Sequence, residues 1–142
     1  MNIRIKIICM LMALPSVLCS AEEQAFAHWK QTLFLSDYCF IAEVVNDPDT
    51  GHKTLKPVEF FWGKHDAFLK SHAKINNYPG FPVGSLFFVH YTRQADGGFS
   101  KSHLQLKKTR SYEDTEIIMY RDDKKMKIQD FRKMAIQRPQ KK

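Results

Sequence analysis

The sequence predicts a small, mainly β (α+β) domain, and three observations carry that prediction. Residues 86–89 are apolar in succession, so an extended segment here must be covered on both faces. Its aromatic and β-branched residues, bounded by Gly84 and Gly97, favour a strand over a turn of helix. Shorter strand-like runs lie before and after this segment, whereas clear helical periodicity occurs towards the two ends of the chain.

The first residues have the layout of a secretory signal peptide, and we predict one over residues 1–21. Arg4 and Lys6 provide a positive start, and the apolar run Ile7–Leu14 is far too short to span a bilayer. Small residues follow this run, so we expect cleavage after Ser20 or Ala21.

The cysteines indicate the compartment. A lipoprotein signal would end at Cys19, but Leu18 stands where a lipobox has Gly, Ala or Ser, so lipid anchoring is not expected. The remaining single domain, residues 22–137, keeps only Cys39, which excludes an intramolecular disulfide framework and favours a bacterial periplasmic or secreted protein. We expect Cys39 to be a small buried residue; the alternatives are an intermolecular disulfide or a reactive thiol.

The domain begins with a helix and a strand. Apolar residues recur at helical spacing from Phe26 to Phe34 and predict an amphipathic helix over residues 22–35. Residues 38–45 alternate as a strand, with every second residue from Tyr38 to Val44 on one face. The polar cluster at residues 46–51 then predicts a turn.

A second strand is predicted over residues 53–62. We expect Val58, Phe60 and Trp62 on one face, and Pro57 indicates that one edge of the strand is unpaired. Residues 65–77 fit either a helix or a short irregular strand. Residues 76–82 are expected to form a loop, held as a fixed lid by their aromatic and proline content.

The second half begins with the central strand, residues 83–92, and a hairpin turn over residues 93–99. Residues 100–107 alternate as a strand with one solvated face. A fifth strand is predicted over residues 115–121, a short return segment over 126–128, and a terminal helix over 130–137 that packs Phe131 and Met134 inward. Residues 138–142 form a basic tail that we expect to be disordered.

The order of these elements resembles a known family. The segments that carry the resemblance are 36–44 (SDYCFIAEV), 58–64 (VEFFWGK) and 81–89 (FPVGSLFFV). They resemble the OB-fold domain of tissue inhibitors of metalloproteinases and netrin-like modules, including cysteine-poor bacterial relatives, over roughly residues 25–107. The resemblance implies a small five-stranded antiparallel OB-like barrel with an N-terminal and a short C-terminal helix.

The resemblance does not extend to the inhibitory site of that family. In the inhibitors, a free N-terminal cysteine held by disulfides binds the protease zinc through its amino group and carbonyl. After processing, this chain would begin near Ala21 or Glu22, with no disulfide to hold its N-terminus. No functional residue of the family can be placed on the chain, and metalloprotease inhibition is not implied.

Positive charge gathers towards the C-terminus. Residues 101–142 hold 13 Lys and Arg against 6 Asp and Glu, whereas residues 21–100 hold 7 against 9. This imbalance indicates attraction to an anionic partner such as lipid headgroups, an acidic polysaccharide or an acidic protein. The alternative is a solvated face that only keeps the protein soluble. Nucleic acid is not expected as a partner of an exported protein.

No motif for catalysis or metal binding stands out. The six histidines contain no i, i+4 pair and no His-Glu-x-x-His motif, and no Cys-x-x-Cys is present. His90 and His103 lie on the two strands of the predicted hairpin, so a site made from them is an alternative, as is an acid–base pair of Glu43 with His90. No serine or cysteine lies in a nucleophile motif. We therefore expect a protein that is not an enzyme and has no metal or cofactor.

We predict an exported binding protein that recognises a protein or an envelope polymer, as an inhibitor or an immunity-type partner of a secreted enzyme does. OB-like barrels bind with the face of strands 2–3 and the flanking loops. The candidate binding residues are the aromatics of this region and the basic loop after residue 106: Trp62, Tyr78, Phe81, Lys107, Lys108 and Arg110. The alternative is an envelope-surface accessory protein held to anionic lipid or polysaccharide by its basic C-terminal third, with no integral membrane span.

Overall fold

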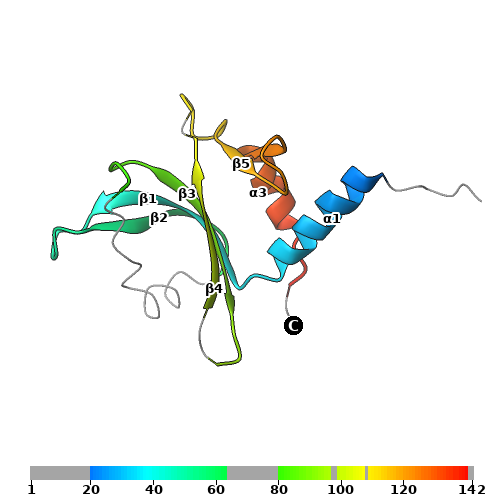
Figure 1. Cartoon of the computed structure of the whole chain (residues 1–142), viewed down its shortest axis with the longest axis horizontal. Helices are drawn as coiled ribbons and strands as arrows, with labels where there is room; N and C mark the ends of the chain where they lie inside the picture. Colours follow the sequence, from blue (N-terminus) through cyan, green and yellow to red (C-terminus); the bar gives the residue numbers. More distant parts are fainter. Residues whose placement is uncertain (1–19, 64–79, 97–98, 108, 141–142) are drawn as a thin grey trace, which may run out of the picture.

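The computed structural model describes residues 20–63, 80–96, 99–107 and 109–140 (Figure 1). The elements in chain order are α1 (Ala21–Phe34), β1 (Tyr38–Asn46), β2 (Lys53–Trp62), β3 (Leu86–Arg93), β4 (Phe99–Leu106), β5 (Glu116–Ile118), β6 (Lys125–Lys127) and α3 (Ile128–Ile136). The mainly β (α+β) prediction and both terminal helices are confirmed. The predictions for residues 1–19, 65–77, Tyr78 and Lys108 lie outside the described residues.

Local hydrogen bonding sets both ends of α1. The Ser20 hydroxyl accepts a hydrogen bond from the Glu23 N–H (3.1 Å), and the Glu23 carboxylate accepts one from the Ser20 N–H (3.2 Å). This capping box satisfies N–H groups that a helix leaves without partners in its first turn. At the other end, the N–H and the hydroxyl of Ser36 both donate to the Leu33 carbonyl (3.0 and 2.6 Å), so the chain leaves the helix there.

Four strands form an antiparallel sheet in the order β2-β1-β3-β4. The central strand β3 lies between β1 and β4, and its residues from Leu86 to Val89 are at most 5 % exposed. The prediction of a strand buried on both faces is therefore confirmed. Pro57 lies on β2, which is an edge strand of this sheet, as its missing N–H indicates.

Alternating residues of β1 and β3 bury two separate clusters, one on each face of the sheet. Figure 1 shows α1, α3 and β5 gathered on one side of the sheet. The cluster on that side contains Cys39 and Ile41 of β1 together with Phe88 of β3. The cluster on the opposite face contains Phe40 of β1 and Val89 of β3. The predicted alternation of β1 is therefore confirmed.

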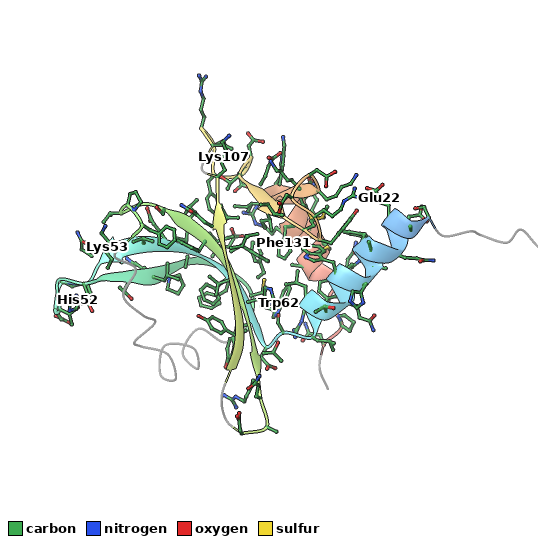
Figure 2. All side chains as sticks on the ribbon, in the orientation of Figure 1. Glu22, His52, Lys53, Trp62, Lys107 and Phe131 are labelled. Atoms are coloured by element: carbon green, nitrogen blue, oxygen red, sulfur yellow. The ribbon has the colours of Figure 1, made fainter. Side chains whose placement is uncertain are left out.

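Phe131 of α3 is the centre of the helix-side cluster and is fully buried (Figure 2). Its ring centroid lies 4.6 Å from that of Phe61, 5.2 Å from that of Phe88 and 6.2 Å from that of Trp62. Trp29 of α1 contacts the same ring from the helix side, at 6.5 Å. One residue therefore joins α3 to two strands and to α1, as its predicted inward orientation requires.

The end of β2 departs from strict alternation. Its pairing with β1 shifts twice and leaves Val58 and Phe61 out of the register. Phe60 consequently packs against the cluster on the open face, whereas Trp62 lies in the helix-side cluster. The expectation that Val58, Phe60 and Trp62 share one face is wrong, because each extra residue at a bulge inverts the alternation that follows it.

The described strands do not close into a barrel. The predicted fifth strand shortens to Glu116–Ile118, which pairs with β6 in a separate two-stranded sheet. A single bridge, from Lys107 to Glu116, links the two sheets. The N–H of Met119 donates to the Lys124 carbonyl (2.8 Å), so a local hairpin takes up backbone groups that barrel closure would need. The five-stranded barrel is therefore corrected to an open sheet plus a hairpin.

Neither described helix combines the length and the apolar content required to cross a bilayer.

Candidate functional site

The structure does not bring the predicted aromatic site residues together. Trp62 is only 9 % exposed and belongs to the helix-side cluster, where its indole N–H donates to the carbonyl and the hydroxyl of Ser36 (3.1 and 3.2 Å). Phe81 packs on the opposite face of the sheet, with its ring centroid 4.9 Å from that of Phe87. Since the sheet lies between them, Trp62 and Phe81 cannot form one aromatic surface.

The two described basic residues of the prediction lie at the far end of β4. Lys107 and Arg110 are both exposed, and Figure 2 shows Lys107 pointing away from the body of the domain. Neither has a carboxylate within ion-pair distance among the described residues. They therefore form a small, unneutralised basic loop that is remote from Trp62.

Most of the cations in the C-terminal third whose side chains are described are neutralised locally. Six of its cations have a carboxylate within 4.0 Å: Arg121, Lys124, Lys125, Lys127, Arg132 and Lys133. Of the other cations in this third whose side chains are described, Lys107, Arg110 and Arg138 have no such partner. Among the described side chains of this third, the cations without a carboxylate partner are therefore confined to a few positions.

Arg132 of α3 is the best-paired cation of the domain. Its Nε and Nη2 donate to the two carboxylate oxygens of Glu59 (2.6 and 3.1 Å), and its Nη1 and Nη2 donate to those of Glu113 (2.8 and 3.1 Å). These hydrogen bonds raise the pKa of Arg132 and lower that of Glu113. The Tyr112 hydroxyl also donates to Glu59 (2.8 Å), and burial followed by this hydrogen bond raises the pKa of Tyr112. The donors and acceptors of this network bind one another, so we assign it a structural role.

A different arrangement holds the C-terminal ends of α1 and α3 side by side. Arg138, the first residue of the predicted tail, donates from Nε to the Phe34 carbonyl and from Nη2 to the Ser36 carbonyl (both 3.0 Å). Its guanidinium also lies over the Trp62 ring, 5.0 Å from the centroid. Lys30 donates to the Gln137 side chain (3.2 Å). Side-chain hydrogen bonds of Gln137 and Arg138 thus fasten the two helix ends.

Two grooves flank the segment 138–140. The apolar groove, of about 430 Å³, lies against α1 and is lined by Ala27, Lys30, Gln31, Phe34, Leu35, Pro139 and Gln140. The arginine pocket, of about 390 Å³, lies between β2 and α3, and its lining includes Glu59, Trp62, Arg132, Ile136, Arg138 and Gln140. Leu35 is 62 % exposed and Ile136 is 82 % exposed. We call the two grooves and these side chains the Arg138 surface.

A larger groove, of about 580 Å³, lies at the other end of α1, beside Tyr120 and Arg121. The charged groups there already satisfy one another: Glu22 pairs with Lys124 and Arg121, and the Tyr120 hydroxyl donates to the same carboxylate (3.3 Å). Hydrogen bonding to Lys124 accordingly lowers the pKa of Glu22. This groove holds no unneutralised charge that would select a partner, whereas the Arg138 surface does.

The histidine and cysteine alternatives find no support in the strand register. His103 is paired with Val89 and His90 with Ser102, so the two histidines do not lie opposite each other. Glu43 is four residues along β1 from the position opposite His90, about 13 Å away at strand spacing. Within the described ranges, no group of three metal-ligating side chains converges. Cys39 is buried, as predicted, and burial raises the pKa of its thiol.

Searches against family models, curated proteins and solved structures returned no match for this chain.

Of the residues that line the Arg138 surface, Trp62 is a predicted site residue, whereas Leu35, Ile136 and Arg138 are not. Leu35 and Ile136 belong to predicted helices, but nothing in the helical pattern distinguishes a side chain that covers the core from one at an exposed end. Arg138 falls in a short basic run whose charge is typical of a solvated tail. A residue of this kind is found only from the carbonyl groups that the fold places next to it.

Proposed function

We propose that the chain is an exported, non-enzymatic binding protein that docks another protein on the Arg138 surface. The observation that carries this proposal is the combination of two highly exposed apolar side chains, Leu35 and Ile136, with adjoining grooves of about 430 and 390 Å³. Apolar side chains exposed beside grooves are a common feature of docking surfaces, because burying them against a partner is favourable.

Charge complementarity indicates an acidic partner. Lys30 and Arg138 border the apolar groove and the arginine pocket, and neither has a carboxylate partner among the described residues. The whole chain carries a formal net charge of +7. A partner that presents an apolar anchor next to carboxylates would bury Leu35 and Ile136 and also neutralise these cations. A secreted enzyme that the chain inhibits, or to which it confers immunity, is the class of partner we favour, by analogy with small exported domains.

Two finer elements of the proposal rest on the sequence alone. Export rests on the signal-peptide layout of residues 1–21, and the expected outcome of expressing the whole chain in a bacterium is a mature protein that begins at Ala21 or Glu22. N-terminal sequencing of the periplasmic fraction measures this, and an unprocessed chain in the cytoplasm would contradict export. An origin in the OB-fold family is the second element, and it rests on the resemblance carried by residues 36–44, 58–64 and 81–89.

Site-specific photocrosslinking in cells tests the docking surface. A photoreactive phenylalanine analogue at Ile136 is expected to give one adduct of discrete size. Leu35→Asp in the same chain should abolish that adduct, because it places a buried charge in the interface. The matched control is the same analogue at Val83, which is 54 % exposed but lies outside this surface. Equal adducts from both positions, or no adduct at Ile136, would reject the proposal.

A second function is favoured by one specific observation. Lys107 and Arg110 follow the end of β4, are exposed and have no carboxylate partner among the described residues, as an anchor for anionic lipid or polysaccharide requires. Co-sedimentation with phosphatidylglycerol vesicles should then occur at low salt and be lost by about 0.5 M salt, where the Debye length is only a few ångströms. The double variant Lys107→Gln, Arg110→Gln should not sediment, whereas Lys133→Gln should; binding that survives in the double variant rejects this function.

A further inference from the structure

We propose that the arginine pocket binds a carboxylate group of the partner, and that Arg138 is the residue that recognises it. This inference rests on the proposed docking function and adds the chemical group that the surface selects. Its premise is the environment of one half-buried guanidinium that contacts carbonyls and an aromatic ring.

The Arg138 guanidinium is held in place before any partner arrives. Hydrogen bonds to the carbonyls of Phe34 and Ser36 fix two sides of the group, and the Trp62 ring lies against its face at 5.0 Å. Trp62 is itself held by its hydrogen bond to the same Ser36 carbonyl. A pre-organised group binds more tightly because little conformational entropy remains to be lost.

The positive charge of Arg138 is not neutralised by these contacts. Guanidinium has five N–H donors, of which Nε and one on Nη2 are used, so three remain for a ligand. The acceptors are neutral carbonyls, and within the described chain no carboxylate lies within 4.0 Å of Arg138. A planar donor fork of this kind matches the two oxygens of a carboxylate.

The pocket beside Arg138 suits a carboxylate that is attached to an apolar group. Glu59 also lines the pocket, but both of its carboxylate oxygens already accept hydrogen bonds from Arg132, and one of them accepts a further hydrogen bond from Tyr112. The remaining walls include Trp62 and the exposed side chain of Ile136. A volume of about 390 Å³ admits a residue-sized group.

The carboxylate can come from an acidic side chain or from the C-terminus of the partner, and two peptide probes separate these sources. N-acetyl-leucyl-leucine presents a terminal carboxylate, and N-acetyl-Leu-Glu-Leu-amide presents only a side-chain carboxylate. N-acetyl-leucyl-leucinamide is the matched probe without a charge. The readout is the chemical shift of the Trp62 indole N–H and the Arg138 Nε–H in ¹H–¹⁵N spectra of the whole chain.

At least one carboxylate probe should shift both resonances saturably, and the uncharged amide should not. Arg138→Lys keeps the charge but loses the fork, so the affinity should fall at least fivefold. Ile136→Asp changes an 82 % exposed residue that folding does not need, and its carboxylate should compete for Arg138 and weaken binding at least tenfold. Val83→Asp adds the same charge elsewhere and should leave the affinity unchanged.

Shifts of equal size with the amide, or carboxylate binding that persists in both Arg138→Lys and Ile136→Asp, would overturn the inference. The outcome is distinguishable from that of the docking proposal. A crosslink at Ile136 with no response to the carboxylate probes keeps the docking surface and rejects the carboxylate site. A response to the probes with no crosslink keeps the site and rejects a protein as its occupant.

Discussion

Each end of α3 has an apolar residue and an arginine close together, but the two pairs differ in how far they are buried and in whether a carboxylate pairs with the arginine. Near its start, Phe131 is fully buried among aromatic rings and Arg132 is held by two carboxylates. At its end, Ile136 is 82 % exposed, and Arg138, two residues further on, donates to two carbonyls and lies over a ring face. The first pair makes its contacts within the domain. The second pair leaves an exposed apolar side chain and an unneutralised cation, which another molecule can contact.

This difference separates residues that build the fold from residues that are available for recognition. Burying an apolar side chain or neutralising a cation stabilises a protein whether the contact is internal or comes from a partner. Where the domain completes these contacts itself, as around Phe131, the result is stability. Where it leaves them incomplete, as around Arg138, the result is the surface for which we propose a docking role.

The largest expected effect compares the two apolar residues of α3. Phe131→Ala should lower the free energy of unfolding by about 3–5 kcal/mol, because the cavity opens among four packed aromatic rings. Ile136→Ala should change it by less than about 0.5 kcal/mol, because the side chain is largely in solvent. Urea denaturation followed by tryptophan fluorescence measures both. Equal losses would show that the two ends of α3 do not differ in the way the structure indicates.

A smaller effect is expected from removing the clamp between the helix ends. Arg138→Gln should lower the free energy of unfolding by about 1–2 kcal/mol, since two hydrogen bonds from a charged group to carbonyls are lost at a half-buried site. Hydrogen exchange should become faster in the last turn of α1. Lys133→Gln, at a side chain that is 77 % exposed, is the control and should leave both quantities unchanged. If the exchange rates do not respond to Arg138→Gln, the clamp does not hold α1.

The pH dependence of stability distinguishes the two arginines directly. The hydrogen bond from Arg132 holds the pKa of Glu113 in the folded chain below its ordinary value of 4.5. A depressed folded pKa stabilises the fold above the unfolded pKa, and this contribution is lost as the pH falls through the folded value. The loss of stability below about pH 4.5 should therefore be shallower in Arg132→Gln. The loss of stability should be unchanged in Arg138→Gln, because Arg138 has no carboxylate partner in the described chain. Identical effects in both variants would contradict this assignment.

Much of the fold follows from local sequence patterns. The capping residues before α1 and the apolar run of β3 each act within a few residues, so their elements are predicted at nearly the observed positions. The face assignment at the end of β2 fails because the bulge at Phe61 depends on how β1 pairs with it. The prediction of a barrel fails for a related reason. β5 could pair either with the main sheet or with β6, and β6 is closer along the chain.

The candidate site shows the same division at the level of single residues. Aromatic character led us to Trp62, but its surroundings bury it as a support for Arg138. Lys107 and Arg110 are exposed as expected, whereas charged residues of the same third, such as Lys127, are neutralised by partners elsewhere in the fold. Residue type alone does not indicate which cations remain unpaired.

From the sequence alone come the helix at the start of the domain, the doubly buried central strand, the burial of Cys39 and the excess of positive charge. Periodicity, capping and composition decide these features, and they act locally or as simple sums over the chain. The tertiary structure decided which faces of the helices and the sheet pack together and that the sheet stays open. It also decided that Arg138 lies against Trp62 with N–H donors that are not used. These features depend on contacts between separate elements, such as that between Arg138 and Trp62, and no local pattern encodes such a contact.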